Sequence, residues 1–353
     1  MHLKDLNPII AEDIDSILAA DIDWKRFKNK TILISGANGF LPSYLVYLFL
    51  SLNEKNKLNC KVIGISRNRK KARQRFGSLL KRKDLSIIYT DVSGPLEVKR
   101  KINFIIHAAS QASPKYFGTD PVGTINANTL GTNNLLTLAK KNKVESFLFI
   151  SSGEVYGSVA SENVPTREDQ YGYIDIDNVR SCYAESKRLG ETMCVSWFKQ
   201  HKVAAKIVRP FHTYGPGMDL KDGRVYADFV SDIVNGRNIK MKSEGRASRA
   251  FCYLKDATEG FIRVLLEGEN GEAYNVGNPQ AEISIAELSQ KLVSLFPEKK
   301  LEVQKGDQST KGYIQSTIDR NSPDITKIKT LGWFPATSIE EGFKRTIESY
   351  MLC

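Results

Sequence analysis

The chain is short of cysteine and has no long uncharged apolar run. Its five cysteines, Cys60, Cys182, Cys194, Cys252 and Cys353, are odd in number, lie far apart and never form a CxxC pair. This pattern argues against disulfides or a zinc site and favours buried or incidental thiols in a reducing compartment. No apolar stretch is long enough to cross a bilayer, and acidic residues interrupt the apolar N-terminus. We therefore expect a cytoplasmic protein without membrane insertion.

Acidic residues are missing from one segment of an otherwise balanced chain. The 353 residues include 51 Lys and Arg against 40 Asp and Glu, a formal net charge of +11. Nine of the basic residues fall between Arg67 and Lys83, and the remaining 42 nearly balance the 40 acidic ones. A polyanionic partner would have to bind this one segment, which we interpret mainly as a solvated helix and loop, so no nucleic-acid partner is expected. The ordinary composition also excludes disordered and collagen-like proteins.

The hydrophobic pattern from residue 29 onward alternates between strands and helices. Apolar runs predict buried parallel strands at 31–35, 61–66, 86–90, 103–109, 146–152 and 204–210. This alternation predicts an α/β fold built on a Rossmann-type, doubly wound parallel sheet. Before it, residues 8–20 have apolar side chains at helical spacing, which predicts a short amphipathic helix.

The predicted division of the chain has three parts. Residues 1–28 would be an N-terminal helical extension, and residues 29–210 with 246–268 would be the dinucleotide-binding domain. Beyond residue 210, glycine and proline become frequent and the alternation of strands and helices loosens. We therefore expect a smaller substrate-binding region from residues 211–245 and 269–353.

A glycine-containing turn joins the first predicted strand to an apolar helix at 43–52. Glycines at such a junction let backbone N–H groups approach a pyrophosphate at the positive end of the helix. Pro42 replaces the third glycine of the usual pattern, and proline is tolerated in the first turn of a helix. The residues of this turn that we expect to contact a dinucleotide are Gly36, Asn38, Gly39, Phe40 and Leu41.

The end of the second strand bears on the choice between NAD and NADP. An NAD site normally has an acidic residue there for the ribose 2′-hydroxyl, but this chain has Ser66 and Arg67. A hydroxyl followed by arginines suits a 2′-phosphate and favours NADP, whereas the same residues can equally be solvated basic residues starting a helix. Asp91, after the third strand, is expected beside the adenine, and residues 107–109, after the fourth, beside the nicotinamide.

Tyr183 and Lys187 stand four residues apart in the segment YAESK. On a helix this spacing puts both side chains on one face. A lysine so placed lowers the pKa of the phenol, which can then take a proton from a substrate hydroxyl while hydride leaves for a nicotinamide. Alone, Tyr-x-x-x-Lys also occurs by chance on solvated helices. Together with the glycine turn and Ser152 at a predicted strand end, it indicates an oxidoreductase site.

With these motifs the chain resembles the extended short-chain dehydrogenase/reductase family, in its nucleotide-sugar epimerase, dehydratase and decarboxylase branch. The resemblance covers nearly everything from residue 31 onward and rests on GANGFLP, HAASQASP, NTLGT, SSGEVYG, YAESK, RPFHTYGPG, DGRV, RAFCYLKD and PDITKIKTLGW. The segments SQASP, DGRV, SRAF and ETMC are most similar to UDP-glucuronate decarboxylases, followed by dTDP-glucose 4,6-dehydratases. The resemblance implies an NAD-dependent enzyme, a nucleotide-sugar substrate and a homodimer.

The resemblance also implies roles for individual residues. Tyr183 would be the base, and Lys187 its electrostatic partner and a ribose ligand. Ser152 would donate a hydrogen bond to the reacting hydroxyl, and Glu154 would act in the second half-reaction. Further cofactor contacts would be Ser66, Arg67, Asp91, Val92, Ala108, Ala109, Ser110, Asn128, Tyr183, Lys187 and Pro210. The substrate contacts would be Ser113, Ser152, Gly153, Glu154, His212, Arg224 and Arg249, with the two arginines at the diphosphate.

Two residues depart from the pattern of the relatives. Gly153 stands where dehydratases have an aspartate that protonates the departing C6 hydroxyl, and glycine cannot donate a proton. His212 stands where relatives usually have an asparagine at the substrate phosphate. This histidine can be either a substrate contact or a structural residue.

All reactions of this branch begin by oxidising a sugar hydroxyl, usually at C4. The absence of an acid at position 153 then makes some of the following steps more expected than others. A β-keto acid can then lose CO2 without an acid at position 153, whereas elimination of a C6 hydroxyl requires one. Re-reduction alone would give an epimer and leave Glu154 without a task. We therefore place decarboxylation first, 4-epimerisation second and 4,6-dehydration third. A non-catalytic dinucleotide-binding regulator is the alternative from another class, and the joint presence of Ser152, Tyr183 and Lys187 argues against it.

Overall fold

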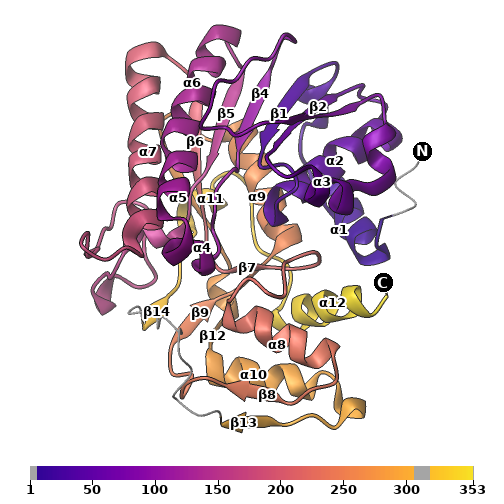
Figure 1. Ribbon diagram of the computed structural model, residues 1–353, viewed down its shortest axis with the longest axis vertical. Helices are drawn as coiled ribbons and strands as arrows, with labels where there is room; N and C mark the ends of the chain where they lie inside the picture. The colour runs from indigo at the N-terminus through magenta and orange to yellow at the C-terminus, as the bar shows by residue number, and fades with distance from the viewer. Residues whose placement is uncertain (1–5, 306–318, 353) are drawn as a thin grey trace.

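The computed structural model describes residues 6–305 and 319–352 (Figure 1). Its main element is a seven-stranded sheet in the order β11-β6-β5-β4-β1-β2-β3, with every neighbouring pair parallel. The strands are β1 (Thr31–Ser35), β2 (Lys61–Ser66), β3 (Leu85–Tyr89), β4 (Phe104–His107), β5 (Ser146–Ile150), β6 (Ala205–Pro210) and β11 (Ala273–Val276). The strand order reverses at β1, where sheets of this kind bind ligands at their carboxyl edge. The predicted Rossmann-type parallel sheet is confirmed.

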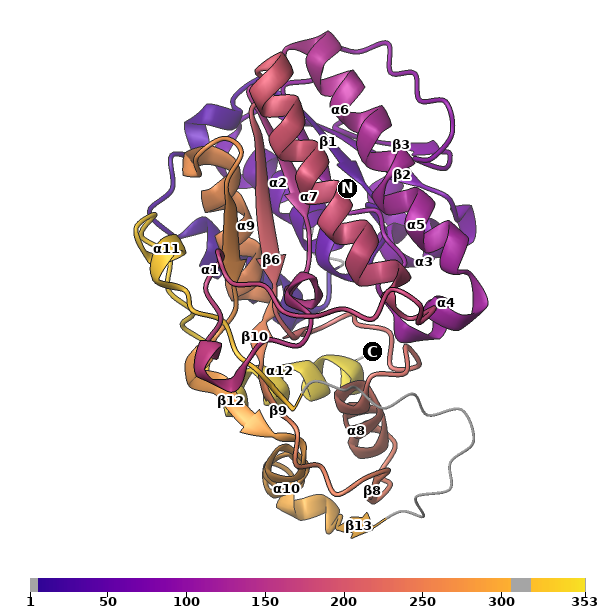
Figure 2. The same ribbon diagram turned by 90° about the vertical axis from the view of Figure 1, so that its left-hand side faces the viewer.

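Helices cover both faces of this sheet (Figures 1 and 2). One face carries α5 (Pro121–Asn128), α6 (Leu130–Asn142) and α7 (Ser181–His201). The other face carries α1 (Pro8–Leu18), α2 (Phe40–Asn56), α3 (Arg69–Phe76) and α9 (Leu254–Glu267). The chain therefore builds three layers, with the sheet buried between two sets of helices.

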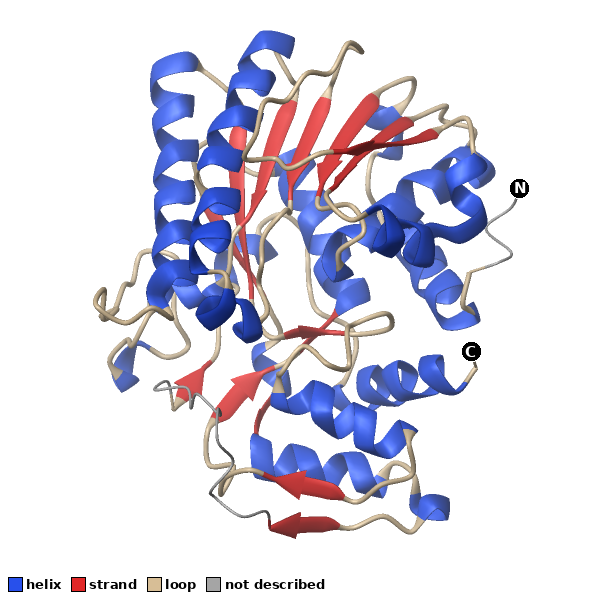
Figure 3. Cartoon of the chain, in the orientation of Figure 1, coloured by secondary structure: helices blue, strands red, loops and turns tan. Residues whose placement is uncertain are grey.

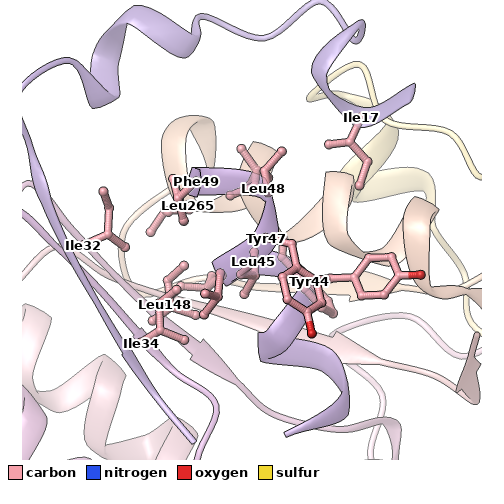
Figure 4. Close-up of a cluster of buried hydrophobic side chains, with 14 of the residues drawn as sticks. Ile17, Ile32, Ile34, Tyr44, Leu45, Tyr47, Leu48, Phe49, Leu148 and Leu265 are labelled. Atoms are coloured by element: carbon pink, nitrogen blue, oxygen red, sulfur yellow. The ribbon is translucent and has the colours of Figure 1, made fainter. Parts of the chain in front are cut away.

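The alternation of side chains along β1 explains why both faces are buried. Ile32 and Ile34 point toward α2 and pack there with Leu45 and Phe49 (Figure 4), whereas Leu33 belongs to the core on the opposite face. Helix α2 is buried along 42–52 because α1 and α9 cover its outer side. An almost continuous apolar helix is therefore accommodated inside the protein.

A smaller region with its own hydrophobic core faces the carboxyl ends of the sheet strands (Figures 1 and 3). Tyr214 and Phe343 stack at its centre, with ring centroids 3.9 Å apart. Its helices are α8 (Val225–Val234), α10 (Ile285–Ser294) and α12 (Ile339–Met351). The short strands outside the main sheet are β7 (Thr213–Tyr214), β8 (Ile239–Met241), β9 (Ser248–Ala250), β10 (Cys252–Tyr253), β12 (Glu282–Ser284), β13 (Val303–Lys305) and β14 (Arg320–Asn321). Two further short helices are α4 (Pro114–Thr119) and α11 (Thr326–Lys329).

The elements differ from the sequence prediction mainly at their ends. The strand predicted at 103–109 ends at His107, and the one predicted at 146–152 ends at Ile150. In both places the chain leaves the sheet because the following residues make turns whose N–H groups bond side-chain oxygens. The helix predicted at 43–52 begins earlier, at Phe40, and the helix predicted at 8–20 ends at Leu18. The sequence prediction did not include β11, which joins the sheet from within residues 269–353.

Helix α1 links the sheet domain to the C-terminal helix through Asp13. This carboxylate is buried and accepts hydrogen bonds from Tyr44 (3.0 Å) and Tyr253 (2.8 Å), and it pairs with Arg345 at 2.8 Å. Burial raises the pKa of Asp13, although Tyr253 and Arg345 act to lower it. Asp13 therefore bonds the N-terminal extension to three other elements, α2, β10 and α12.

The basic segment at 67–83 is mainly a solvated helix and turn, as interpreted, because seven of its nine basic residues are exposed. The Arg82 side chain is 9% exposed, and it pairs with Asp84 at 2.8 Å and with Glu54. Arg75 donates to the Gly217 carbonyl at 2.8 Å and so ties α3 to the smaller region. Several of the excess charges therefore hold elements together.

The described thiols are all free. Cys60, Cys194 and Cys252 are buried and Cys182 is half-buried, whereas Cys353 lies outside the described residues. Within residues 6–305 and 319–352, no helix combines the length and the hydrophobicity that a membrane span requires. In the same ranges, no group of three or more His, Cys, Asp or Glu side chains could hold a metal ion.

Candidate active site

The turn between β1 and α2 leaves room for a ligand's phosphates but not for a side chain. Gly36 has φ +65°, and a Cβ at this position would lie 2.8 Å from the Cα of Ala109. Gly39 is the N-cap of α2 and supplies no side-chain hydrogen bond to the first turn, where Pro42 lies as predicted. Uncapped N–H groups at the positive end of a helix bind anions well. This glycine cradle therefore fits the pyrophosphate of a dinucleotide.

A buried histidine supports the turn that follows β4. Ser35 Oγ accepts hydrogen bonds from the N–H groups of Ala108 (3.1 Å) and Ala109 (3.0 Å), so its own proton goes to His107 Nδ1 at 2.8 Å. The His107 proton must then sit on Nε2, which donates to Thr132 Oγ1 at 3.1 Å. Burial lowers the pKa of His107 to about 3, so the ring is neutral. We had expected His107 beside the nicotinamide. It is instead fully buried and acts through Ser35, which fixes the backbone of Ala108 and Ala109.

Two of the expected cofactor contacts have unused hydrogen-bonding capacity. Ser110 Oγ and Asn128 Oδ1 are buried and have no hydrogen-bond partner among the described residues. The Asn128 amide is oriented by its Nδ2, which donates to Ser186 Oγ at 2.9 Å. An unpaired buried oxygen is costly, and a bound polar group can remove that cost. Both side chains therefore fit a site that a cofactor or water completes.

An ion pair occupies the edge of the sheet at β2 and β3. Arg67 Nη1 lies 3.2 Å from Asp91 Oδ2, and both side chains are exposed. Burial raises the pKa of Asp91, but the Ser93 N–H group and Arg67 outweigh it, so that this pKa is lowered overall. The Ser66 hydroxyl is buried and contacts the Asn68 carbonyl at 3.4 Å. The arginine that stands where an acid is usual after β2 is thus paired with an acid that follows β3.

The other expected cofactor residues lie at the carboxyl edge of the sheet or next to it. Val92 is buried against Gly131 of α6, where any Cβ would lie 2.6 Å from Val92 Cγ2. Pro210 ends β6, opposite Val276 of β11. Neither has a polar side chain, so a polar contact from either residue would have to come from its backbone.

The end of β5 and helix α7 bring Ser152, Tyr183 and Lys187 together. The Ser152 hydroxyl lies beside the Tyr183 phenol and acts to lower its pKa. Lys187 Nζ donates to the Ile150 carbonyl at 2.6 Å and lies 5.9 Å from the centroid of the Tyr183 ring. The Tyr183 ring stacks on Phe117 of α4, with centroids 5.1 Å apart. A phenol, a hydroxyl and an ammonium group therefore meet in one buried place.

Burial dominates the titration of both catalytic candidates on α7. It raises the pKa of Tyr183, while Ser152 and Arg224 oppose the rise. It lowers the pKa of Lys187 to about 7, while Glu191 opposes the fall. A protonated Lys187 on the same face of the helix favours the phenolate form of Tyr183.

Gly153 lies directly under an aromatic ring. A Cβ at Gly153 would lie 3.2 Å from the nearest atoms of Phe211. Glu154 follows in a 3-10 turn (Gly153–Tyr156), and its N–H group donates to Ser152 Oγ at 3.2 Å. The strand end thus presents a hydroxyl and a carboxylate, with no room for an acidic side chain between them unless Phe211 moves.

Two arginines and a histidine gather on the side of the smaller region. Burial lowers the pKa of His212 far below its usual value, and Arg249 and Arg224 lower it further, so His212 is neutral. Arg224 donates to the Ala112 carbonyl at 3.1 Å, and Arg249 donates to the Ser248 carbonyl at 2.7 Å. These residues form a positive surface that suits a diphosphate. Neutral His212 can serve there either as a contact or as packing.

Ser113 connects the two sides of the site. Its Oγ donates to the Asp222 carbonyl at 2.5 Å, just before Arg224. This bond joins the turn after β4 to the segment that carries one of the two arginines. Ser113 therefore spans the junction between the sheet and the smaller region.

Sequence reasoning missed a buried ion pair behind the site. Arg209 of β6 donates to the Glu191 carboxylate through Nη2 (2.6 Å) and Nε (3.0 Å). Both residues stood in segments that carried the family resemblance, RPFHTYGPG and ETMC. A charged residue inside an apolar strand was the available signal, because a buried charge requires a partner.

Fold and site together define a dinucleotide-binding enzyme with a Tyr–Lys pair at the carboxyl edge of its sheet. Residues 32–277 match the NAD dependent epimerase/dehydratase family, and the chain belongs to this family. It is 34% identical over 328 residues to UDP-glucuronic acid decarboxylase 5 of Arabidopsis thaliana, covering 92% of this chain and 90% of that protein. It is 33% identical over 323 residues to UDP-glucuronic acid decarboxylase 1 of Xenopus tropicalis, covering 91% of this chain and 72% of that protein.

Solved structures show the same fold. UDP-N-acetylglucosamine 4-epimerase from Methanobrevibacter ruminantium superposes with a TM-score of 0.78 and 22% identity, over 92% of this chain and 99% of that one. UDP-glucuronic acid 4-epimerase from Bacillus cereus gives a TM-score of 0.73 and 21% identity, over 91% of this chain and 99% of that one. The predicted class, an NAD(P)-dependent enzyme of the extended short-chain dehydrogenase/reductase type, is confirmed.

Proposed function

We propose that the protein oxidises a UDP-glucuronate-like nucleotide sugar at C4 and then releases CO2, leaving a nucleotide pentose. The observation that carries this proposal is Gly153 beneath Phe211, beside Ser152. Elimination of a C6 hydroxyl would need an acid at that position, whereas loss of CO2 does not. Two relatives at 33 to 34% identity bear the name UDP-glucuronic acid decarboxylase, which supports the same choice.

The proposed first step is a proton transfer to Tyr183. Ser152 holds the C4 hydroxyl and Tyr183 takes its proton, with Lys187 favouring the phenolate. When bound, NAD would supply a hydride acceptor for the oxidation at C4 and a hydride donor for the final reduction. The cradle at Gly36, together with the unpaired oxygens of Ser110 and Asn128, supports cofactor binding beside this pair.

The proposed second step breaks the bond between C5 and the carboxylate carbon. Its electron pair moves toward the C4 ketone as CO2 leaves, and C5 then gains a proton. We assign Glu154, the residue after Gly153, to this second step. When hydride returns to C4, Tyr183 gives its proton back to the C4 oxygen, and the enzyme regains its starting state.

We propose NAD as the cofactor in preference to NADP. The Arg67 guanidinium is already paired with Asp91 at 3.2 Å. A ribose 2′-phosphate would have to compete with the Asp91 carboxylate for that guanidinium and would meet its negative charge. A ribose hydroxyl can instead donate a hydrogen bond to the same carboxylate.

We also propose a homodimer formed through α5 and α7. These two helices lie side by side on one surface of the molecule (Figure 2). Val122 and Ile125 of α5 and Leu189 of α7 are all exposed, the last by 51%. Apolar side chains gathered on one surface commonly mark an interface with another protein. A second copy of the chain would cover them.

The proposed organisation of the chain keeps three parts. Residues 1–28 are the extension, residues 29–210 with 246–268 bind the dinucleotide, and residues 211–245 with 269–353 bind the nucleotide sugar. The separate cores on the two sides of the site support this division, with β11 as the exception because it joins the sheet. We place the enzyme in the cytoplasm.

The test is a product analysis with purified protein, NAD and UDP-glucuronate. We expect CO2 and a UDP-pentose in equal amounts, and neither product with Tyr183→Phe. A UDP-hexuronate epimer without CO2 would identify a 4-epimerase instead. A 4-keto-6-deoxy product from a nucleotide hexose would identify a dehydratase, and no conversion of UDP-glucuronate would reject the proposal.

A further inference from the structure

Three consecutive residues at the end of β5 each contact a different residue of α7. The three helix residues stand four apart, at 183, 187 and 191, and so share one face of the helix. The contacts are a carbonyl with an ammonium group, a hydroxyl with a carboxylate, and a hydroxyl with a phenol. The pairs are Ile150 with Lys187, Ser151 with Glu191, and Ser152 with Tyr183.

The middle contact is anchored more firmly than the other two. Ser151 Oγ donates to Glu191 Oε1 at 2.5 Å, and Arg209 donates to both oxygens of the same carboxylate. The Glu191 side chain is 10% exposed and that of Arg209 is 2% exposed. The remaining Arg209 Nη1 donates to Tyr156 Oη (2.9 Å) and to the Glu168 carbonyl (2.8 Å). Strands β5 and β6 and helix α7 therefore meet at one carboxylate.

We propose that Glu191 and Arg209 are a positioning pair for the hydride-transfer site: they set the register of the β5 end against α7 and supply the negative charge that keeps Lys187 protonated beside Tyr183. This inference rests on the proposed function, because it takes Tyr183 as the base. Neither residue touches substrate in this role. Both act through Lys187 and Ser152.

The charges around Lys187 single out Glu191. On its own helix, Lys187 faces Tyr183, Glu191 and Cys194; from the sheet it faces His107. His107 is neutral, and burial raises the pKa of the Cys194 thiol, so it is protonated. Glu191 is therefore the full negative charge among these four neighbours.

The other two members of the site have neighbours of their own. Tyr183 also faces Arg224 and Glu154, which lie on the substrate side. Glu191 also faces Arg209 and Tyr156 from the sheet side. Removing Glu191 therefore changes the field at Lys187 and leaves the substrate-side charges in place.

Loss of Glu191 has a definite effect on pH dependence. Burial already lowers the pKa of Lys187 to about 7, and Glu191 acts to raise it. Without Glu191, Lys187 loses its proton at lower pH, and Tyr183 then loses the cation that favours its phenolate. Lys187 titrates below Tyr183, so the acid limb of the activity profile follows Lys187 and should move to lower pH, and the basic limb follows Tyr183 and should move to higher pH. The height of the profile should fall, because fewer molecules carry both a protonated Lys187 and an ionised Tyr183.

The experiment compares the pH profiles of kcat and kcat/KM for wild type, Glu191→Gln and a matched control. We expect Glu191→Gln to lower kcat about tenfold on the plateau of the profile with nearly unchanged KM, and to move the acid limb down by about one unit. Glu185→Gln removes a carboxylate from the outer side of the same helix, where Glu185 pairs with Arg188 at 3.2 Å. This control should keep the wild-type profile.

A second variant covers the case in which Glu191→Gln fails to fold around an unpaired Arg209. Glu191→Gln combined with Arg209→Met removes both buried charges, which proteins tolerate better than removal of one. It should show the same lowered and broadened pH profile. A wild-type profile in a folded variant, or an equal change in Glu185→Gln, would overturn the positioning role.

A spectroscopic measurement separates this inference from the proposed reaction. The ultraviolet signal of tyrosinate is titrated in NAD-bound protein without substrate, and the same titration of the matching Tyr183→Phe protein is subtracted. We expect the pKa of Tyr183 to be higher in Glu191→Gln than in the wild type. If the pKa of Tyr183 rises in Glu191→Gln but the wild type does not convert UDP-glucuronate, the proposed reaction is rejected and the positioning role is retained. No shift, with normal decarboxylation by wild type, would reject the pair alone.

Discussion

A side chain at Gly153 would press against Phe211, because even its Cβ would lie 3.2 Å from the ring. Gly153→Ala should therefore lower the free energy of unfolding by about 1–2 kcal/mol, a usual cost of overpacking. Combining it with Phe211→Leu should recover part of this cost. A double-mutant cycle in denaturant measures the coupling, which we expect to exceed about 0.5 kcal/mol. Strictly additive changes would show that the ring does not restrict this position.

The hydroxyl of Tyr183 is expected to be essential to the chemistry and dispensable for binding. Tyr183→Phe keeps the ring that stacks on Phe117 but removes the group that contacts Ser152. NAD affinity should stay within about twofold, while hydride transfer falls by about a hundredfold or more. Single-turnover absorbance of the reduced nicotinamide measures the transfer, and the exposed Tyr173→Phe is the control. Undiminished transfer would remove Tyr183 as the base.

The pairing of Arg67 with Asp91 predicts how cofactor preference can be changed. Asp91→Asn removes the competing carboxylate charge and frees the guanidinium. The ratio of NADP affinity to NAD affinity should rise by about tenfold, the range of one charge-assisted contact. Titration calorimetry with both dinucleotides measures it. Adding Arg67→Ala should abolish the gain, and a gain that survives this second change would contradict the mechanism.

The exposed leucine of α7 offers a test of the homodimer. Leu189→Glu places a charge on the surface formed by α5 and α7, where a buried unpaired carboxylate would be costly. We expect sedimentation velocity to show the dimer fraction falling by about tenfold or more at a fixed concentration. Phe334→Glu, an exposed apolar residue between α11 and α12, is the control. A monomeric wild-type protein would contradict the proposed dimer.

The buried carboxylate of Asp13 should contribute far more stability than an exposed one on the same helix. Asp13→Ala leaves Tyr44, Tyr253 and Arg345 without their shared partner, and we expect a loss of about 3–5 kcal/mol. Asp15→Ala removes a carboxylate that pairs with Lys55 at the surface and should cost less than about 1 kcal/mol. Denaturant unfolding compares the two, and equal losses would refute the linking role of Asp13.

The sequence predicted the parts of the fold that local patterns encode. The first six strands are recognisable because each is a run of apolar residues, and Tyr183 and Lys187 are recognisable by their spacing. Strand β11 was missed because the polar Asn275 interrupts its apolar run. That amide is buried yet satisfied by the carbonyls of Thr166 and Asp324, which are distant in the sequence.

The supporting residues of the site were harder to predict for the same reason. Glu191 and Arg209 lie on different elements, and only the packing of α7 against the sheet brings them together. The pairing of Arg67 with Asp91 likewise needs β2 and β3 to be neighbours. A one-dimensional pattern shows that a charged residue is present but not which opposite charge it meets.

The bond between Asp13 and Arg345 also shows how much chain this architecture needs. Both residues lie outside the segment that matches the family, residues 32–277, whereas Tyr44 and Tyr253 lie inside it. A fragment trimmed to the matching segment would lose the acid and its cation together and leave two buried phenols unpaired. The smallest fragment that keeps these contacts therefore extends at least from α1 to α12.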